Sequence, residues 1–358
     1  MQKTAFFLGA NTPNGFHSLY DGFVHPEGGD FLWVLKGTPG SGKSSFMKHI
    51  GATAENAGLD VEYIYCSGDP DSLDGVYIPQ KHIAYVDGTS PHVIEPPLPG
   101  AGGAYLDLTQ YIDYTALAAQ RDALAALTRR YKAKYSDAYS LLSSLPGTEP
   151  EHLDGLLTAE DISAVRRRAK SAVRRNIPVK VGAVGTETRR FLGAFTFKGR
   201  IVLTDTVRSL CRRIYALDDQ LGLNTVFLRE IAAGALQRGE NVICCMDPLD
   251  PEKPEAVLLP GLSLAYVSAG ISHGLSCRRI RLDDIPDKQR IQAFRGRIRA
   301  LAHIRSAVLA QAEQSLAEAK ALHDELEALY NPHVDFDRVF DTAQKHMDAL
   351  LQQPEVSR

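Results

Sequence analysis

The sequence has few cysteines and no marked excess of charge of either sign. Its five cysteines contain no Cys-x-x-Cys pair, and their odd number argues against a framework of disulfides. A Cys-rich zinc site and a disulfide-stapled secreted domain are therefore not expected. Forty Lys and Arg residues against 43 Asp and Glu give a net charge of −3. The molecule as a whole is thus no polyanion binder, although a local basic patch is compatible with this sum.

Long hydrophobic runs are absent as well. No run reaches 18 apolar residues, which predicts that the chain has no transmembrane helix and no membrane partner. The apolar N-terminal stretch is interrupted by Gly9 and Asn11 too early for a signal peptide. We therefore expect a reduced, cytoplasmic protein. Its 358 residues, 44% of them hydrophobic, suffice for two domains with sizeable cores.

The chain contains an internal repeat. FLGANTPNG at residues 7–15 recurs as FLGAFTFKG at residues 191–199, with six of nine positions identical. Such self-similarity at a fixed offset is typical of a duplicated unit, and we place the boundary between the two copies near residue 185. Further matches keep the same order along the chain: Asp69-Pro70 with Asp250-Pro251, Pro79 with Pro260, Ala84-Tyr85-Val86 with Ala265-Tyr266-Val267, and His92 with His273.

Each copy has the same predicted order of elements. Short apolar runs alternate with a helical stretch at the start, as in parallel strands joined by crossovers. A helical arm follows, at about 113–177 in the first copy and about 287–352 in the second, where apolar residues recur at steps of three and four. An unbroken helix over 287–330 would be about 65 Å long, so this arm either projects or folds back as a hairpin.

The clearest motif is GTPGSGKS at residues 37–44, a full match to the phosphate-binding loop pattern GxxxxGK[ST]. Its glycines let successive main-chain N–H groups face a phosphate, and the helix that follows adds the positive end of its dipole. Lys43 supplies a cation for the β- and γ-phosphates, and the Ser44 hydroxyl is suited to binding Mg²⁺. The predicted nucleotide-binding residues are Gly37, Thr38, Pro39, Gly40, Ser41, Gly42, Lys43, Ser44 and Ser45.

A carboxylate to hold the metal ion follows an apolar run. Asp87 ends the predicted strand at residues 83–86, where a metal-binding Asp of a P-loop protein is expected. We predict that Lys43 and Asp87 are catalytic and that Ser44 and Asp87 are metal ligands. Gly88 stands where many motor-type ATPases have a water-activating Glu, so hydrolysis is slow or the phosphate is transferred to another acceptor.

Polar side chains after the second predicted strand are candidates for a second-substrate site. In open α/β folds, loops at the carboxyl ends of strands line the ligand crevice. Asp69 and Asp71 lie in such a loop with Asp74 as a third carboxylate, and His92 lies near enough in the sequence to the metal carboxylate to accept a proton. The alternatives are a hydrated turn for the Asp residues and a structural role for His92, which recurs as His273.

The second copy lacks the phosphate-binding pattern. Alignment of residues 36–50 with 217–231 places Asn224 at the position of Lys43 and Leu223 at that of the last glycine. Asp219 adds negative charge where phosphates would bind, and like charges a few ångströms apart repel. Ser268 replaces the metal carboxylate. The second copy is therefore predicted to be a pseudo-domain that binds no nucleotide.

With these motifs, the chain resembles a sparsely characterised bacterial family of duplicated (tandem) P-loop ATPases over nearly its full length. The matching segments are residues 9–16, 37–44, 66–75 and 86–92. Many members keep the loop in both halves, and this chain departs from that pattern in its second half. The resemblance implies an α/β P-loop NTPase fold with a three-layer parallel sheet, in a nucleotide-binding domain over 1–185 and a degenerate pseudo-domain over 186–358. ATP and Mg²⁺ are the implied ligand and cofactor.

Three functions stay open at this point: a Mg²⁺-dependent ATPase with nucleotide only in the N-terminal half, a P-loop kinase of a small molecule or nucleotide, and a nucleotide-dependent binding module without significant catalysis. A protein partner or self-association through the helical arms is compatible with all three. Residues 166–213 carry fourteen Lys or Arg and two acidic residues. A solvated face is the favoured interpretation of that stretch, and a nucleic-acid surface is the alternative.

Overall fold

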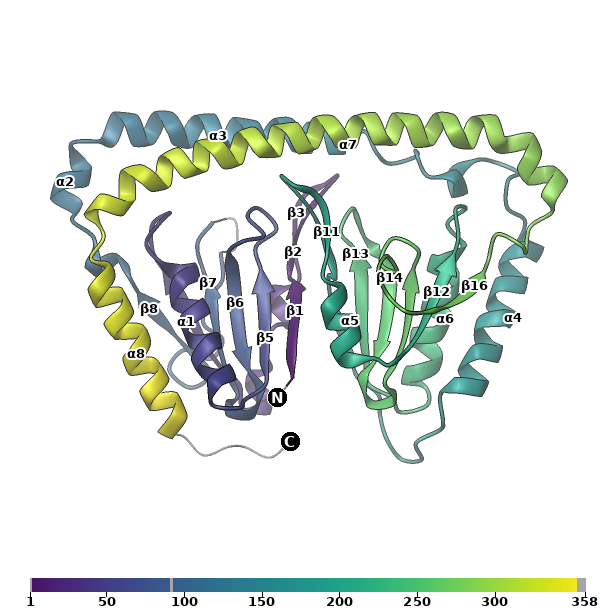
Figure 1. Ribbon diagram of the computed structural model, residues 1–358, viewed down its shortest axis with the longest axis horizontal. Helices are drawn as coiled ribbons and strands as arrows, with labels where there is room; N and C mark the ends of the chain where they lie inside the picture. The colour runs from purple at the N-terminus through teal and green to yellow at the C-terminus, as the bar shows by residue number, and fades with distance from the viewer. Residues whose placement is uncertain (1, 91–92, 353–358) are drawn as a thin grey trace.

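The computed structural model describes residues 2–90 and 93–352. Two six-stranded sheets stand side by side. One long helix runs across the top of both, and a second helix lies along it over the first sheet (Figure 1). The fold is α/β, as predicted, and its sheets are mixed with mostly parallel strands. No helix of the described residues is both long and apolar enough to span a bilayer.

The first sheet has the strand order β1-β5-β6-β7-β4-β8. β6 is antiparallel to β5 and β7, so the prediction of an all-parallel sheet is wrong at this strand. The reason is the short turn at Pro79–Lys81, because a parallel pair needs a crossover of about a dozen residues or more. The strands are β1 (Lys3–Phe7), β4 (Phe31–Lys36), β5 (Val61–Tyr65), β6 (Leu73–Ile78), β7 (Ile83–Asp87) and β8 (Gly103–Asp107).

The second sheet has the same order when its strands are taken in turn, β9-β13-β14-β15-β12-β16. β14 is antiparallel to both neighbours, as β6 is in the first sheet, and the other pairs are parallel. The two halves therefore share one topology. The strands are β9 (Glu187–Arg190), β12 (Arg213–Asp218), β13 (Val242–Asp247), β14 (Asp250–Leu259), β15 (Leu264–Ser268) and β16 (Arg278–Arg281).

The repeated nine-residue segment forms a small hairpin in each half: β2 (Gly9–Thr12) with β3 (Gly15–Ser18), and β10 (Gly193–Thr196) with β11 (Gly199–Val202). In each turn the Thr hydroxyl donates to the carbonyl of the following Gly, which has a positive φ. The halves meet beside these hairpins. Phe7 and Phe191 each donate a main-chain N–H to the other's carbonyl, at 2.9 and 3.0 Å.

A pair of helices connects the two halves at the top of the molecule. α7 (Lys288–Tyr330) is one unbroken helix of 43 residues, about 65 Å long at 1.5 Å per residue, and α3 (Arg121–Leu142) lies along it (Figure 1). The predicted apolar face of α7 is buried over residues 312–326, whereas earlier positions of the pattern are half-buried or, at Ile304, 50% exposed. Ala312 and Leu316 of α7 are buried with Ala138 and Leu142 of α3, so these two helices cover each other within one chain.

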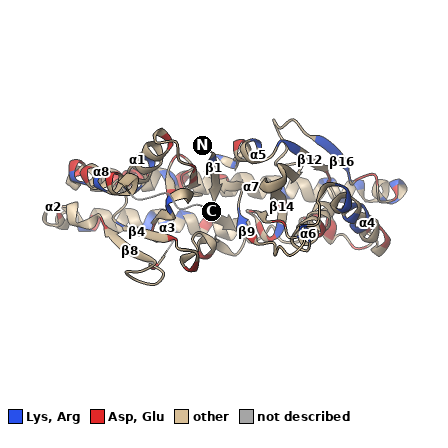
Figure 2. Cartoon of the chain, turned by 90° about the horizontal axis from the view of Figure 1, so that it is seen from below, with Lys and Arg blue, Asp and Glu red and all other residues tan. Residues whose placement is uncertain are grey.

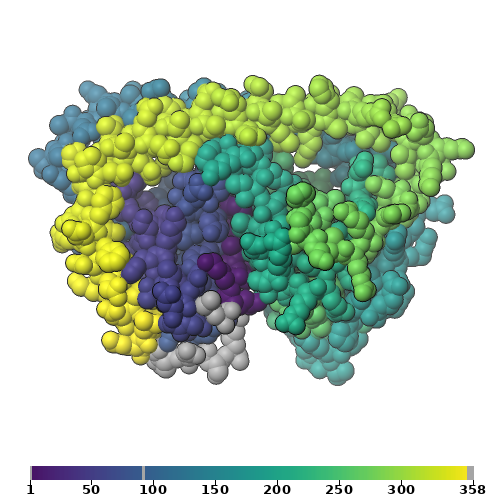
Figure 3. Space-filling model, in the orientation of Figure 1, coloured from purple at the N-terminus to yellow at the C-terminus, as the bar shows by residue number. Residues whose placement is uncertain are grey.

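The last helix of each half packs against the other half. α4 (Ala159–Asn176) packs against α6 (Leu223–Leu236) of the second half, whereas α8 (Phe336–Gln352) packs against α1 (Lys43–Asn56) of the first. Figure 3 shows α7 spanning both halves and α8 covering the outer side of the first. The helical arms at 113–177 and 287–352 therefore do not stay on their own halves. The remaining helices are α2 (Tyr114–Ala118) and α5 (Thr204–Leu210).

Candidate functional site

The loop at residues 37–42 connects β4 to α1 at the carboxyl end of the first sheet. Gly42 precedes the first residue of α1 with φ 85°, and Gly40 has φ 69°, a left-handed conformation that glycine adopts at little cost. A Cβ on Gly37 would overlap the hydroxyl of Ser41. The pattern residues are therefore required by backbone geometry, and the loop amides lie at the positive end of α1.

Lys43 and Asp87 come together beneath this loop. The Lys43 ammonium donates to the Thr38 carbonyl at 2.9 Å and lies 3.6 Å from Asp87 Oδ2, with 9% of the side chain exposed. β4 and β7 are paired so that Leu35 lies opposite Asp87, which explains the approach. The other oxygen of Asp87 accepts the N–H and hydroxyl of Thr89, at 2.8 and 2.6 Å. The geometry leaves Oδ2 directed toward the lysine and the cavity.

The residues present fit a bound phosphate and a divalent cation. The hydroxyls of Thr38 and Ser41 are buried without a hydrogen-bond partner within the described part of the chain. Ser44 Oγ accepts the Leu73 N–H at 3.0 Å, and a hydroxyl oxygen has a second lone pair for a metal. Ser44 and Asp87 are thus the residues that would hold Mg²⁺, as their positions in the sequence predict.

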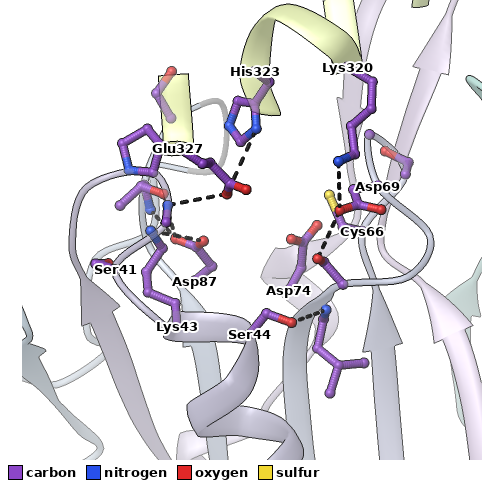
Figure 4. A pocket seen from close by; sticks show the side chains of 18 of the residues that line it. Ser41, Lys43, Ser44, Cys66, Asp69, Asp74, Asp87, Lys320, His323 and Glu327 are labelled. Carbon is purple, nitrogen blue, oxygen red and sulfur yellow. Dashed lines mark hydrogen bonds and ion pairs between the residues drawn. The ribbon is translucent and has the colours of Figure 1, made fainter. Parts of the chain in front are cut away.

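A cavity of about 640 Å³ opens beside the loop. It lies between the carboxyl ends of the strands and the helix pair α3/α7. Figure 4 shows side chains from the strand ends and from α7 directed into it. Asp74, the third carboxylate of the polar stretch after the second predicted strand, is 5% exposed and points into the cavity near Asp87 and Ser44. Three tyrosines one helical turn apart on α3 line the far wall: Tyr131, Tyr135 and Tyr139.

The candidate second-substrate residues have different positions. Asp69 lines the cavity, where its carboxylate lies 3.5 Å from the Lys320 ammonium. Asp71 does not line it: this residue is exposed, and the ammonium of Lys198, 2.5 Å away, holds the pKa of its carboxyl below the usual value. His92 lies outside the described residues. Of the two candidates within the described residues, only Asp69 lines the cavity.

Cys66 also borders the cavity. Burial raises the pKa of its thiol well above the ordinary value, and the nearby carboxylate of Asp74 adds to this effect. The thiol is therefore protonated at neutral pH and is a poor nucleophile. Cys66 directly follows β5 and is half-buried.

The carboxyl-terminal end of α7 forms a wall of the site that the sequence analysis missed. Glu327 Oε1 accepts the main-chain N–H of Gly40 at 3.2 Å, so a carboxylate binds the phosphate loop itself. The side-chain amide of Asn331 donates to the Gly40 carbonyl at 2.9 Å. His323 lies one turn earlier, with Nδ1 3.8 Å from Glu327 Oε1. Nothing in the spacing of a long amphipathic helix identifies which distant loop its last turns contact.

The loop of the second half has a similar helix start but different chemistry. Gly222 precedes α6 with φ 85°, as Gly42 precedes α1. The residue that aligns with Lys43 is therefore Leu223. The predicted alignment of Lys43 with Asn224 is wrong by one residue because the second loop is shorter. The carboxylate of Asp219 accepts the N–H groups of Leu221 and Asn224, at 2.9 and 2.7 Å.

The sheet register identifies the counterpart of Asp87 in the second half. Leu217 lies opposite Ser268, just as Leu35 lies opposite Asp87. A serine therefore replaces the carboxylate, as predicted. The second loop has neither the cation nor the metal ligand, and a carboxylate already occupies its amides.

Most arginines of the basic stretch lie at the surface of the second half. Arg190 is an exception: it is 5% exposed, and its guanidinium donates to Glu62 of the first half at 2.9 Å. The arginines of α4 are exposed, and Figure 2 shows them beside the basic strand β16. Arg166 and Lys170 lie 3.5 and 3.8 Å from the carboxylate of Glu230, so part of this charge is neutralised locally. This arrangement agrees with the predicted solvated face.

No model of a protein family matches the chain, and no curated protein or solved structure shows significant similarity to it.

Proposed function

We propose that the N-terminal half binds ATP with Mg²⁺ and hydrolyses it, and that the chain is a duplicated P-loop NTPase with a degenerate second half. The observation that carries this proposal is the loop before α1, in which the ammonium of Lys43 lies 3.6 Å from the carboxylate of Asp87. A loop of inward amides, a buried cation and a carboxylate on the neighbouring strand are the parts that a triphosphate site needs. The shared strand order of the two sheets supports the duplication.

Each part has a defined role in this mechanism. The loop amides and the dipole of α1 hold the phosphates, and Lys43 stabilises the charge that develops during transfer. When bound at Ser44 and Asp87, Mg²⁺ supplies further neutralisation of phosphate charge. The sequence lacks the Asn-Lys-x-Asp tetrapeptide of guanine-specific proteins, which favours ATP over GTP.

The experiment is a titration of wild type and Lys43→Ala with ATP and GTP in the presence of Mg²⁺, following binding by calorimetry and turnover by phosphate release. We expect Lys43→Ala to weaken ATP binding at least tenfold, about 1.4 kcal/mol, and to abolish turnover. The exposed Lys288 at the start of α7 provides a matched control, since Lys288→Ala removes the same charge far from the loop. Absence of binding to wild type would contradict the proposal.

A kinase is the second candidate, and the size of the cavity favours it. The tyrosines of α3 and Asp69 line the same cavity as Ser44 and Asp87. A polar acceptor bound there would lie next to the transferred phosphate. Adding candidate acceptors to the same turnover assay separates the two functions, because a kinase releases ADP much faster with its acceptor than with water alone.

A further inference from the structure

The position after the metal-binding carboxylate cannot hold a base in this protein. A Cβ on Gly88 would overlap a methyl group of Val34 on the neighbouring strand, so a glutamate does not fit there. Hydrolysis still needs a group that accepts a proton from the attacking water. That group must come from another element.

The acidic groups of the cavity have different partners. Asp87 is paired with Lys43 and held by Thr89. Asp69 shares the ammonium of Lys320 with Asp324. Asp74 accepts the hydroxyl of Tyr20 at 3.3 Å and lies on the sheet side of the cavity. Glu327 differs from these groups because its carboxylate accepts an N–H of the phosphate loop itself, and because its neighbour on α7 is the imidazole of His323.

We propose that Glu327 is the catalytic base of this site, supplied by the second half of the chain through α7. The inference rests on the proposed ATPase function. In the structure, Glu327 accepts the N–H of Gly40, which is also a donor to a bound phosphate. Two anions cannot share this donor without strong repulsion. ATP therefore displaces the carboxylate, which remains beside the loop next to the terminal phosphate.

The step is balanced as follows. A water oxygen forms a bond to the γ-phosphorus, and the bond from that phosphorus to the β–γ bridging oxygen breaks. The bridging oxygen leaves on ADP with the bonding electron pair, and the proton of the water passes to the carboxylate of Glu327. The imidazole of His323, 3.8 Å from this carboxylate, lies on the side away from the loop. It is a positioning residue, and α7 carries both groups.

The test compares Glu327→Gln with wild type in ATP binding and in single-turnover phosphate release. Gln keeps the size of the side chain and removes its charge and basicity. We expect ATP to bind severalfold more tightly, because the competing anion is gone, while turnover falls by at least about a hundredfold. Glu325→Gln is the control: this residue is exposed on the same turn of α7 and has no partner among the described residues.

The outcomes separate this inference from the proposed function. If wild type hydrolyses ATP and Glu327→Gln turns over as fast or faster, Glu327 only occupies the empty loop and the inference is wrong, while the ATPase proposal stands. If wild type neither binds nor hydrolyses ATP, both fail. Glu327→Asp guards against a folding defect: it restores the charge with a shorter reach, so turnover above that of Glu327→Gln, at equal thermal stability, supports the base.

Discussion

The carboxylate of Asp219 places a negative charge in the loop of the second half. It accepts two loop N–H groups, yet burial raises its pKa from the ordinary 3.8 to about 6. A group with a raised pKa in the folded state binds its proton more tightly there than in the unfolded chain. Its favourable contribution to stability is therefore complete below pH 4 and is lost as the pH rises through 6.

Asp219→Asn should therefore stabilise the protein at neutral pH. The substitution removes the cost of the buried charge but keeps one acceptor oxygen, so one of the two loop N–H groups loses its hydrogen bond, at about 1 kcal/mol. We expect the free energy of unfolding to rise by about 1–2 kcal/mol at pH 7.5 and not to rise near pH 4, measured by urea denaturation. Asp284→Asn, at an exposed residue in a nearby loop, should show no such difference. An effect of equal size at both pH values would refute this assignment.

Single residues were predictable where sequence neighbours form the site. Spacing alone predicted that Lys43 and Asp87 lie together. The phosphate-loop pattern gives the position of Lys43, and the end of an apolar run gives the position of Asp87. Glu327 was not predictable, since its contact with Gly40 joins residues 287 positions apart. Asp74 was predicted only as one of three carboxylates in a polar stretch, because the spacing does not show which of them face the cavity. The predicted alignment of Lys43 with Asn224 instead of Leu223 was wrong because the second loop is shorter. Only the sheet register shows where that loop begins.

At the scale of elements, α8 is the helix that ties the second half to the candidate site. Met347 is fully buried in the core that also holds Phe46 and Met47 of α1, the helix that begins at the phosphate loop. Met347→Ala should destabilise the protein by about 2–4 kcal/mol through the lost contacts and the remaining cavity. We also expect weaker ATP binding because α1 loses its support. Denaturation with and without MgATP measures both effects.

The control for this prediction lies two residues earlier on α8. Lys345 is exposed, so Lys345→Ala should leave stability and ATP binding unchanged. A Met347→Ala protein with normal stability would show that α8 is not part of the core of the first half.

Helices were predictable as elements but not as neighbours. Steps of three and four between apolar residues predicted α3 and α7, because the pattern shows that one face is buried. The same pattern does not show what covers that face. The exchange of α4 and α8 between the halves depends on contacts that only the folded chain forms. The reversed direction of β6 has a local cause, the short turn before β7, which the pattern of apolar runs does not show.

At the scale of the whole molecule, the exchanged helices make the halves interdependent. A chain cut after residue 182, in a connection where Val181 and Val184 are 96% and 88% exposed, leaves each fragment without the helix that covers its sheet. The first fragment would lose α8 from α1, and the second would lose α4 from α6. Each would then expose apolar surface of the kind that makes isolated fragments aggregate.

We therefore expect neither fragment to unfold cooperatively alone, as followed by circular dichroism, and we expect the two to purify together as a one-to-one complex when co-expressed. That complex should bind ATP, because α3 and α7 still meet and the end of α7 still reaches the phosphate loop. The cut itself breaks no packed element, so the intact chain and the complex should have similar unfolding temperatures. A fragment of residues 1–182 that is monomeric, unfolds cooperatively and binds ATP would show that the halves are independent domains joined by a tether, and that α8 and Glu327 are dispensable for the site.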